Sequence, residues 1–144
     1  MPSKIIDLND VPDIQNALFF TGTNNRDYIY YATPTKVYTI DLTMHTATPD
    51  YTVPITESPD EVITSMAVWL GYGMMNYTNN RGEMATTSSS NNMLVVTTYS
   101  PSLKEGFVRT LPISIFTGRI EQNKDYHGLF RGFGKITATT PQKQ

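Results

Sequence analysis

Short apolar segments alternate with polar, turn-forming stretches along almost the whole chain. The clearest pair is Tyr28–Ala32 and Lys36–Leu42, separated by Thr33-Pro34-Thr35. Tyr, Ile and Val fill these segments, and such aromatic and β-branched side chains suit the pleated, half-buried surface of a sheet. The pattern therefore predicts a β-hairpin with a tight turn over Tyr28–Leu42.

Further strands are expected wherever this pattern recurs. Glu61–Leu70 is the longest apolar run, and both of its alternating residue sets are mostly apolar, which predicts a strand buried on both faces. Prolines flank Asp50–Pro54, so we expect an edge strand there. The other expected strands are Asn16–Gly22, Met93–Tyr99, Phe107–Ile115, Gly128–Phe133 and Lys135–Thr139, with a turn at Thr43–Pro49.

The stretch Gly71–Ser90 has no such pattern. It is rich in Gly, Asn, Thr and Ser, and it predicts a long irregular loop. Loops longer than about 12–15 residues are uncommon in compact domains and are often functional.

The two halves of the chain resemble each other. In each, an Asn-Asn pair precedes two strands, and Thr39 and Thr110 each stand two residues after a valine. Each half would supply four strands, which is the pattern of a β-propeller blade. We therefore expect an all-β fold of antiparallel four-stranded sheets, with one blade over 14–55, a second over 61–133 and the start of a third at 135–139.

Chain length limits this interpretation. Closed propellers need about four to eight blades, and 144 residues supply two. The chain is then a fragment of a longer protein, or copies of it close a ring, or the two sheets pack as a sandwich.

Composition adds constraints on function. Only 17% of residues are charged and the net charge is −2. No segment is strongly basic, so nucleic acid is not an expected partner. Cys is absent, which excludes disulfides, thiolate metal sites and Cys nucleophiles. No apolar run reaches the roughly 18 residues of a membrane span, and the N-terminus lacks a signal peptide's apolar core, so an export signal would lie outside this stretch.

Several segments together resemble one known family. They are PDIQNALFF from Pro12, YYATPTKVYTIDL from Tyr30, DEVITSMAVW from Asp60, and Gly132-Phe133-Gly134-Lys135-Ile136. The chain resembles the C-terminal propeller region of the PKD-like family lipoproteins of Bacteroidetes, and the resemblance extends from Pro12 to about Thr139.

The resemblance implies a lipid-anchored protein of the bacterial cell envelope, at the cell surface or the periplasmic face of the outer membrane. Such proteins are often encoded near outer-membrane nutrient importers, and the family has no established catalytic residues. This chain lacks the lipobox Cys, the PKD-like modules and most of the blades, and these departures favour a fragment.

Residues with catalytic or metal-binding potential are sparse. His45 and His127 are the only histidines and lack metal-ligand spacing, so we expect both at the surface. The carboxylates near the N-terminus and in turns, including Asp60, Glu61, Glu105 and Glu121, are expected to be solvated. We predict no enzyme activity, no cofactor and no metal site.

Aromatic and amide side chains near the irregular stretch are the remaining candidates. Exposed rings with amides beside them suit sugars and peptides. The predicted ligand-binding residues are Tyr72, Asn76, Tyr77, Asn79, Asn80 and Arg81. Trp69 and Tyr99 are expected to pack between sheets instead.

These observations predict a non-enzymatic binding or scaffolding module. Its partner would be a glycan, a peptide or another envelope protein, and copies of the chain are a further expected partner. A purely structural platform and a carbohydrate-active enzyme on a propeller are the alternatives. The enzyme would need two carboxylates held about 5–9.5 Å apart.

Overall fold

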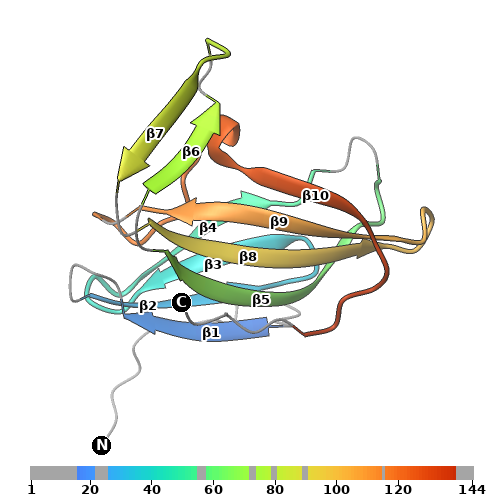
Figure 1. Cartoon of the computed structure of the whole chain (residues 1–144). Helices are drawn as coiled ribbons and strands as arrows, with labels where there is room; N and C mark the ends of the chain where they lie inside the picture. The colour runs from blue at the N-terminus through green and yellow to red at the C-terminus, as the bar shows by residue number, and fades with distance from the viewer. Residues whose placement is uncertain are drawn as a thin grey trace, which may run out of the picture.

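Ten strands occur in the part of the chain that the computed structural model describes, which comprises residues 16–21, 26–54, 58–71, 74–78, 81–88, 91–114 and 116–138 (Figure 1). The first four-stranded sheet has the order β1-β2-β3-β4, and the second has the order β10-β9-β8-β5. Both are antiparallel. The first sheet consists of β1 (Asn16–Thr21), β2 (Asp27–Ala32), β3 (Lys36–Asp41) and β4 (Thr46–Thr52). The second consists of β5 (Val62–Gly71), β8 (Asn91–Ser100), β9 (Glu105–Ile113) and β10 (Gly128–Phe133).

The hairpin predicted over Tyr28–Leu42 is present as β2 and β3. Its turn is closed by the Thr33 N–H, which donates to the Lys36 carbonyl at 3.0 Å, and by the Lys36 N–H, which donates to Thr33 Oγ1 at 3.1 Å. Across the strands the rings of Tyr31 and Tyr38 stack with centroids 4.9 Å apart. Such cross-strand aromatic pairs stabilise a hairpin and set its register.

A hydrophobic core lies between the two sheets. Alternate residues of the first sheet, among them Tyr28, Tyr30 and Val37, pack with Leu94 and Leu111 of the second. Burying a large apolar side chain stabilises a fold by about 1.5–3 kcal/mol, so this shared layer is the main attraction between the sheets. The predicted all-β class with antiparallel sheets is confirmed.

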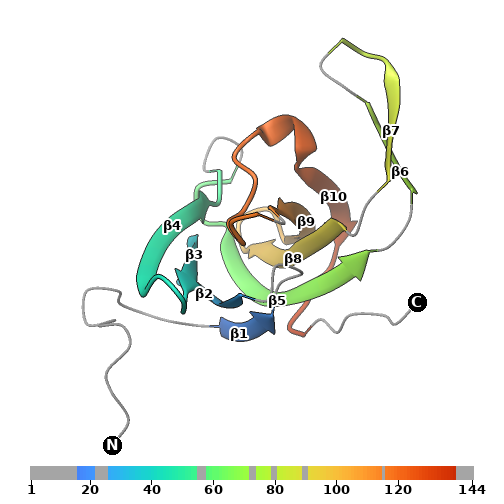
Figure 2. The ribbon, with the colours of Figure 1, turned by 90° about the vertical axis from the view of Figure 1, so that its left-hand side faces the viewer.

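The sheets converge at one edge and diverge at the other. Strands β1 and β5 lie side by side, whereas β4 and β10 lie apart (Figure 2). The connection from β9 to β10 passes between these two separated strands and includes the short 3-10 helix η1 (Lys124–Tyr126).

Part of that connection enters the core. Ile120 is buried among the core residues and forms an isolated β-bridge with Ile113. Gly118 lies against the ring of Tyr28, and the Tyr30 hydroxyl donates to the Gly118 carbonyl at 2.7 Å. The connection therefore joins the second sheet to the inner face of the first.

Three expected elements differ from the observed ones. Residues 46–49 were expected in a turn, but β4 already begins at Thr46, because Pro49 fits an edge strand whose partner is on one side only. The stretch Gly71–Ser90 contains a hairpin of β6 (Met74–Thr78) and β7 (Met84–Ser88) rather than only irregular chain. Residues 134–138 form no strand. They cross the outer face of the second sheet, where Thr97 Oγ1 donates to the Ile136 carbonyl at 3.5 Å.

Three expectations about burial were also wrong. Trp69 does not pack between the sheets, because β5 is an edge strand and the Trp69 side chain is 41% exposed. Tyr99 is only partly buried and lies beside Lys135, whose Nζ is 5.7 Å from the ring centroid. Glu61 is buried rather than solvated.

Within the described residues, no helix has the length and apolar character needed to cross a membrane.

Candidate functional site

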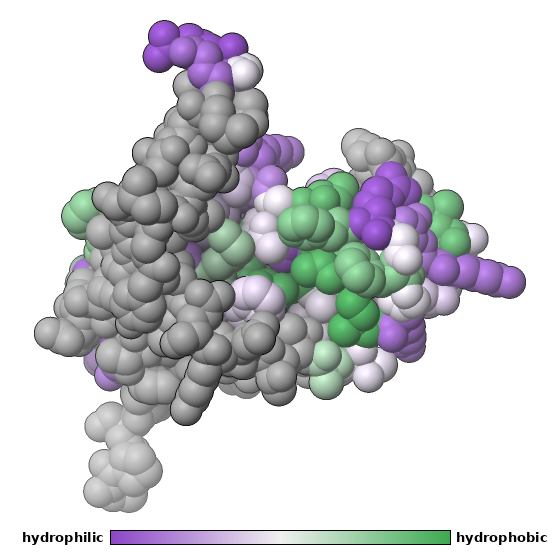
Figure 3. Space-filling model, in the orientation of Figure 1, coloured by the Kyte–Doolittle hydropathy of each residue, from purple (hydrophilic) through white to green (hydrophobic). Residues whose placement is uncertain are grey.

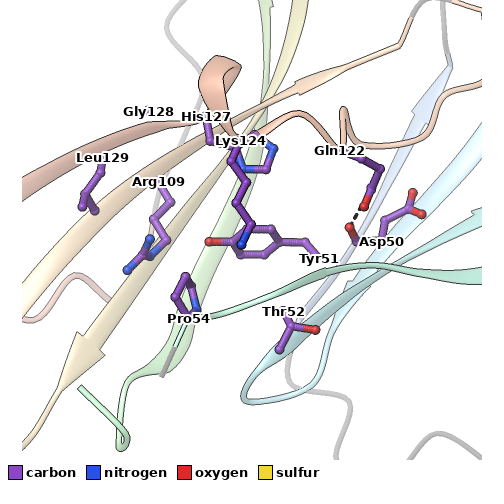
Figure 4. A pocket seen from close by; sticks show the side chains of 10 residues that line it. All are labelled: Asp50, Tyr51, Thr52, Pro54, Arg109, Gln122, Lys124, His127, Gly128 and Leu129. Atoms are coloured by element: carbon purple, nitrogen blue, oxygen red, sulfur yellow. Dashed lines mark hydrogen bonds between the residues drawn. The ribbon is translucent and has the colours of Figure 1, made fainter. Parts of the chain in front are cut away.

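A cleft of about 310 Å³ lies where β4 and β10 diverge (Figure 4). Strand β4 and the residues after it form one wall, and β10 with the η1 segment forms the other. Ten residues line the cleft: Asp50, Tyr51, Thr52, Pro54, Arg109, Gln122, Lys124, His127, Gly128 and Leu129. Its volume is at the lower end of the range of roughly 300–1,000 Å³ for small-molecule sites.

Tyr51 forms the aromatic floor of the cleft. It lies opposite Val37 in the first sheet and packs, partly buried, against the core. Burial raises the pKa of the Tyr51 phenol, and the neighbouring Arg109 partly opposes that shift. The phenol is therefore neutral at physiological pH. The ring meets His127 edge-on with centroids 5.8 Å apart.

Arg109 is held at one end of the cleft by a buried ion pair. Its Nε and Nη2 donate to the two carboxylate oxygens of Glu61 at 2.8 and 3.0 Å. The Arg109 side chain is 13% exposed and that of Glu61 is 2% exposed. Burial lowers the pKa of Arg109, but its interactions with Glu61 and with Tyr51 outweigh this and the net shift is upward. Arg109 is thus permanently charged, and its charge is already balanced.

Asp50 is the extra residue of a β-bulge in β4, since Tyr51 pairs with Val37 and Pro49 pairs with Tyr38. Bulges re-aim side chains, and here the fully buried carboxylate meets the β9–β10 connection. Asp50 Oδ1 accepts from Arg119 Nε and Nη2 at 2.9 and 2.7 Å. Oδ2 accepts from the Thr39 hydroxyl at 2.7 Å and from the Ile120 N–H at 3.1 Å. Both oxygens are therefore engaged inside the protein.

The η1 segment presents Lys124 and His127 to the cleft. Asn123 caps η1 by accepting from the Asp125 N–H at 3.0 Å, and the His127 N–H donates to the Lys124 carbonyl at 3.1 Å. His127 Nε2 is 2.6 Å from the Glu121 carbonyl. A carbonyl only accepts, so Nε2 carries a hydrogen, and in this tautomer Nδ1 is an acceptor.

Gln122 closes the other end of the cleft. Its Nε2 donates to the carbonyls of Asp50 and Ile120, both at 2.9 Å. These two bonds fix the orientation of the amide, because carbonyl oxygens cannot donate. The Gln122 amide oxygen is left as a hydrogen-bond acceptor at this end of the cleft.

A second hollow of about 200 Å³ lies elsewhere against the first sheet. Its two arginines are paired, Arg26 with Asp41 at 3.0 Å and Arg119 with Asp50 at 2.7 Å. Threonines supply most of the remaining lining, which consists of Thr39, Asp41, Met44, Thr46, Thr48 and Thr117. This hollow contains no aromatic side chain and is smaller than the cleft.

The sequence-predicted ligand residues that the structure describes, Asn76, Tyr77 and Arg81, do not line the cleft. Arg81 is exposed between β6 and β7 and lies 3.4 Å from Glu83. Asn76 and Tyr77 belong to β6, where they pair with Thr86 and Ala85. Tyr72, Asn79 and Asn80 lie outside the described residues. The hairpin projects away from both sheets (Figures 1 and 2), so a site there stays a separate prediction.

Sequence reasoning missed the cleft, although one signal was present. Arg109 stands at an alternate position with Phe107 and Leu111 in β9, and strand alternation places these residues on the same, buried face. A lone charged residue on such a face indicates a buried partner or a site. His127 was expected at the surface, and it is half-buried in the cleft wall.

Metal ligands do not cluster in the described segments, which contain no group of three or more His, Cys, Asp or Glu residues suited to an ion. Comparison of the chain with protein-family models, with curated proteins and with solved structures found no match.

Proposed function

We propose that this chain is a non-enzymatic binding module of a bacterial cell-envelope lipoprotein, and that its ligand site is the cleft between β4 and β10. The envelope setting rests on the family resemblance of the sequence. The cleft is supported by one observation, the convergence of an aromatic floor with polar side chains in an open hollow. Such a combination is the usual form of a small-ligand site.

A saccharide is the ligand class that fits these groups best. The Tyr51 ring offers an apolar surface, and the Gln122 amide oxygen and His127 Nδ1 offer acceptors for hydroxyl hydrogens. The small volume suits the end of a glycan chain or a short segment of it. Peptide and protein ligands, also expected from the sequence, have no comparable support in the cleft.

Binding is favoured over catalysis by the state of the carboxylates. Among the residues that line the described cleft, Asp50 is the only carboxylate, and both of its oxygens already accept hydrogen bonds. Glycoside hydrolysis ordinarily requires two carboxyl groups that flank the bond to be broken.

The test is affinity electrophoresis through gels that contain soluble neutral or acidic polysaccharides. The Thr52→Trp variant places a bulky side chain at an exposed lining position and should abolish retardation. Thr46→Trp is the matched control, because it is exposed on the same strand but lines the second hollow. Loss of binding in Thr46→Trp alone would assign the site to that second hollow. Absence of retardation in every gel would contradict saccharide binding.

A scaffolding role is the second candidate, because β10 is an edge strand of the described sheet and has an apolar surface. Leu129, Phe130 and Phe133 are exposed on it, and hydrophobic residues gather on this side of the molecule (Figure 3). Exposed apolar edge strands tend to pair with other chains. If copies of this chain associate there, the solution mass should exceed that of a monomer and Phe130→Lys should restore the monomer.

The packing of the two sheets on each other also bears on the architecture. We infer a two-sheet sandwich rather than two propeller blades, because both sheets bury their inner faces in one core. The strand order within each sheet also occurs in a propeller blade. A propeller would require further sheets that form a ring together with these two.

A further inference from the structure

We propose that the saccharide bound in the cleft is an acidic one, and that Lys124 recognises its carboxylate. This inference rests on the proposed function and specifies the chemical class of the ligand. It comes from the charges along the cleft, each of which can be assigned to a partner.

Two of the three charged side chains that line the cleft are balanced from within the protein. Arg109 is paired with the buried Glu61, and Asp50 is paired with Arg119. A ligand that enters the cleft therefore experiences no net charge from either Arg109 or Asp50.

Lys124 is the third charged group. It is exposed, it lines the same cleft as Tyr51 (Figure 4), and it has no ion pair with any of the described residues. An ammonium group in a cleft with an aromatic floor, where the other charges cancel, favours an anion there. A charge-assisted hydrogen bond is shorter and stronger than a neutral one.

The neighbouring acceptors distinguish an acidic sugar from other anions. Gln122 uses both amide hydrogens internally, and His127 Nε2–H donates to Glu121. The Gln122 oxygen can then only accept, as can His127 Nδ1 in the Nε2–H tautomer. A ligand that satisfies one ammonium donor and two nearby acceptors needs a carboxylate with hydroxyl groups close to it, which is the composition of a uronate. Sulfate, which carries no O–H group, would leave these acceptors without donors.

The experiment compares acidic polysaccharides with their neutral methyl esters. Polygalacturonate, alginate and hyaluronate serve as probes, each beside its methyl-esterified form, with dextran sulfate as a polyanion that lacks carboxylates. Affinity electrophoresis and calorimetry should show binding to at least one carboxylate polymer and at least about tenfold weaker binding to its ester.

The matched variants are Lys124→Met, which keeps the apolar stem, and Lys104→Met, at an exposed turn outside the cleft. Lys124→Met should weaken binding to the acidic polymer by at least about tenfold. Lys124→Arg should retain most of the affinity, and Lys104→Met should have no effect.

Three results would overturn the inference. Equal affinity for the acid and its ester would show that the carboxylate is not recognised, while saccharide binding itself would stand. Equal or tighter binding to dextran sulfate would show attraction to any polyanion. Retention of acidic-polymer affinity in Lys124→Met would assign recognition to another residue. Absence of binding to every saccharide, neutral or acidic, would instead contradict the proposed function itself.

Discussion

At the scale of single residues, two buried carboxylates, one in β4 and one directly before β5, have similar side-chain partners. Asp50 accepts from a threonine hydroxyl and an arginine, Thr39 and Arg119. Glu61 likewise accepts from Thr98 and Arg109. Desolvating a carboxylate is costly unless it is paired and hydrogen-bonded, so each triad is sensitive to the loss of any member.

Glu61→Gln should destabilise the protein by about 3–5 kcal/mol, because it leaves the Arg109 guanidinium buried without a counter-charge. Urea unfolding followed by Trp69 fluorescence measures the free energy of unfolding. Glu83→Gln is the matched control at an exposed pair, and it should change that free energy by less than about 1 kcal/mol. Equal effects of the two substitutions would mean that the Glu61 pair contributes nothing to stability.

Asp60 should make the stability of the protein depend on pH. Hydrogen bonds from Ser100, then from Ser102 and Ser58, lower its pKa from 3.8 to about 2. The unfolded chain therefore binds the proton more readily, and the stabilisation is present above the unfolded pKa and is lost as pH falls through about 2. Thermal unfolding of the wild type and Asp60→Asn should differ by a constant amount above about pH 5 and converge between about pH 4 and 2. An unchanged difference at pH 2 would contradict this linkage.

At the scale of elements, the hairpin β6–β7 is an insertion in an otherwise continuous sheet. Strands β5 and β8 pair along their length, and the last pair is Gly71 with Asn91. All the residues of the hairpin lie between these two positions. A two-stranded hairpin alone is at best marginally stable, so this element contributes little to the fold.

Replacing residues 72–90 by Asn-Gly should preserve the fold, because a two-residue Asn-Gly turn closes antiparallel strands such as β5 and β8. We expect the melting temperature to change by no more than about 5 °C, since shortening a loop alters the closure entropy only slightly. Saccharide binding should persist if the cleft is the site. Loss of binding with the fold intact would instead favour the residues first predicted, Tyr72 to Arg81.

The strands were predictable from sequence where alternation was strong. The segments now seen as β2, β3, β8 and β10 were located within one or two residues, because β-branched and aromatic residues are dense there. The hairpin β6–β7 was not predicted, since Thr, Asn and Met alternate without a clear apolar face. The β4 boundary was missed because Pro49 resembles a turn residue and sequence cannot show that the strand is at an edge.

The cleft was harder to predict than the strands, because its groups come from β4, β9 and the η1 segment. No local motif connects Tyr51, Arg109 and Lys124, and their proximity depends on how the two sheets pack. The sequence did suggest aromatic and amide groups as the binding chemistry. It assigned them to the hairpin segment, where they are close in sequence.

At the scale of the whole molecule, the two sheets are joined by the β9–β10 connection as well as by the core. Gly118 has a φ of +70° and touches the Tyr28 ring, and its carbonyl accepts from Tyr30. A side chain at this position would meet the aromatic ring directly. The connection therefore needs glycine both for its backbone conformation and for the space available.

Gly118→Ala should destabilise the protein more than Gly82→Ala. Gly82 has a similar φ of +77°, but a Cβ there would meet nothing within 4 Å. The Gly82 variant should lose about 1–2 kcal/mol from backbone strain alone, and the Gly118 variant about 1–3 kcal/mol more from overpacking. Chemical denaturation of both variants measures the difference, and equal losses would show that Tyr28 moves aside without cost.

The sequential order of strands in each sheet has a consequence for synthesis. The first sheet is complete by Thr52. Arg119 follows its partner Asp50 by 69 residues in the chain. At ribosomal rates of about 5–20 residues per second, the interval is on the order of 3–14 s. During this time the nascent chain exposes a tyrosine-rich apolar face, and the Asp50 carboxylate lacks its partner Arg119. We expect this partly synthesised chain, rather than the folded protein, to be the form that needs a chaperone.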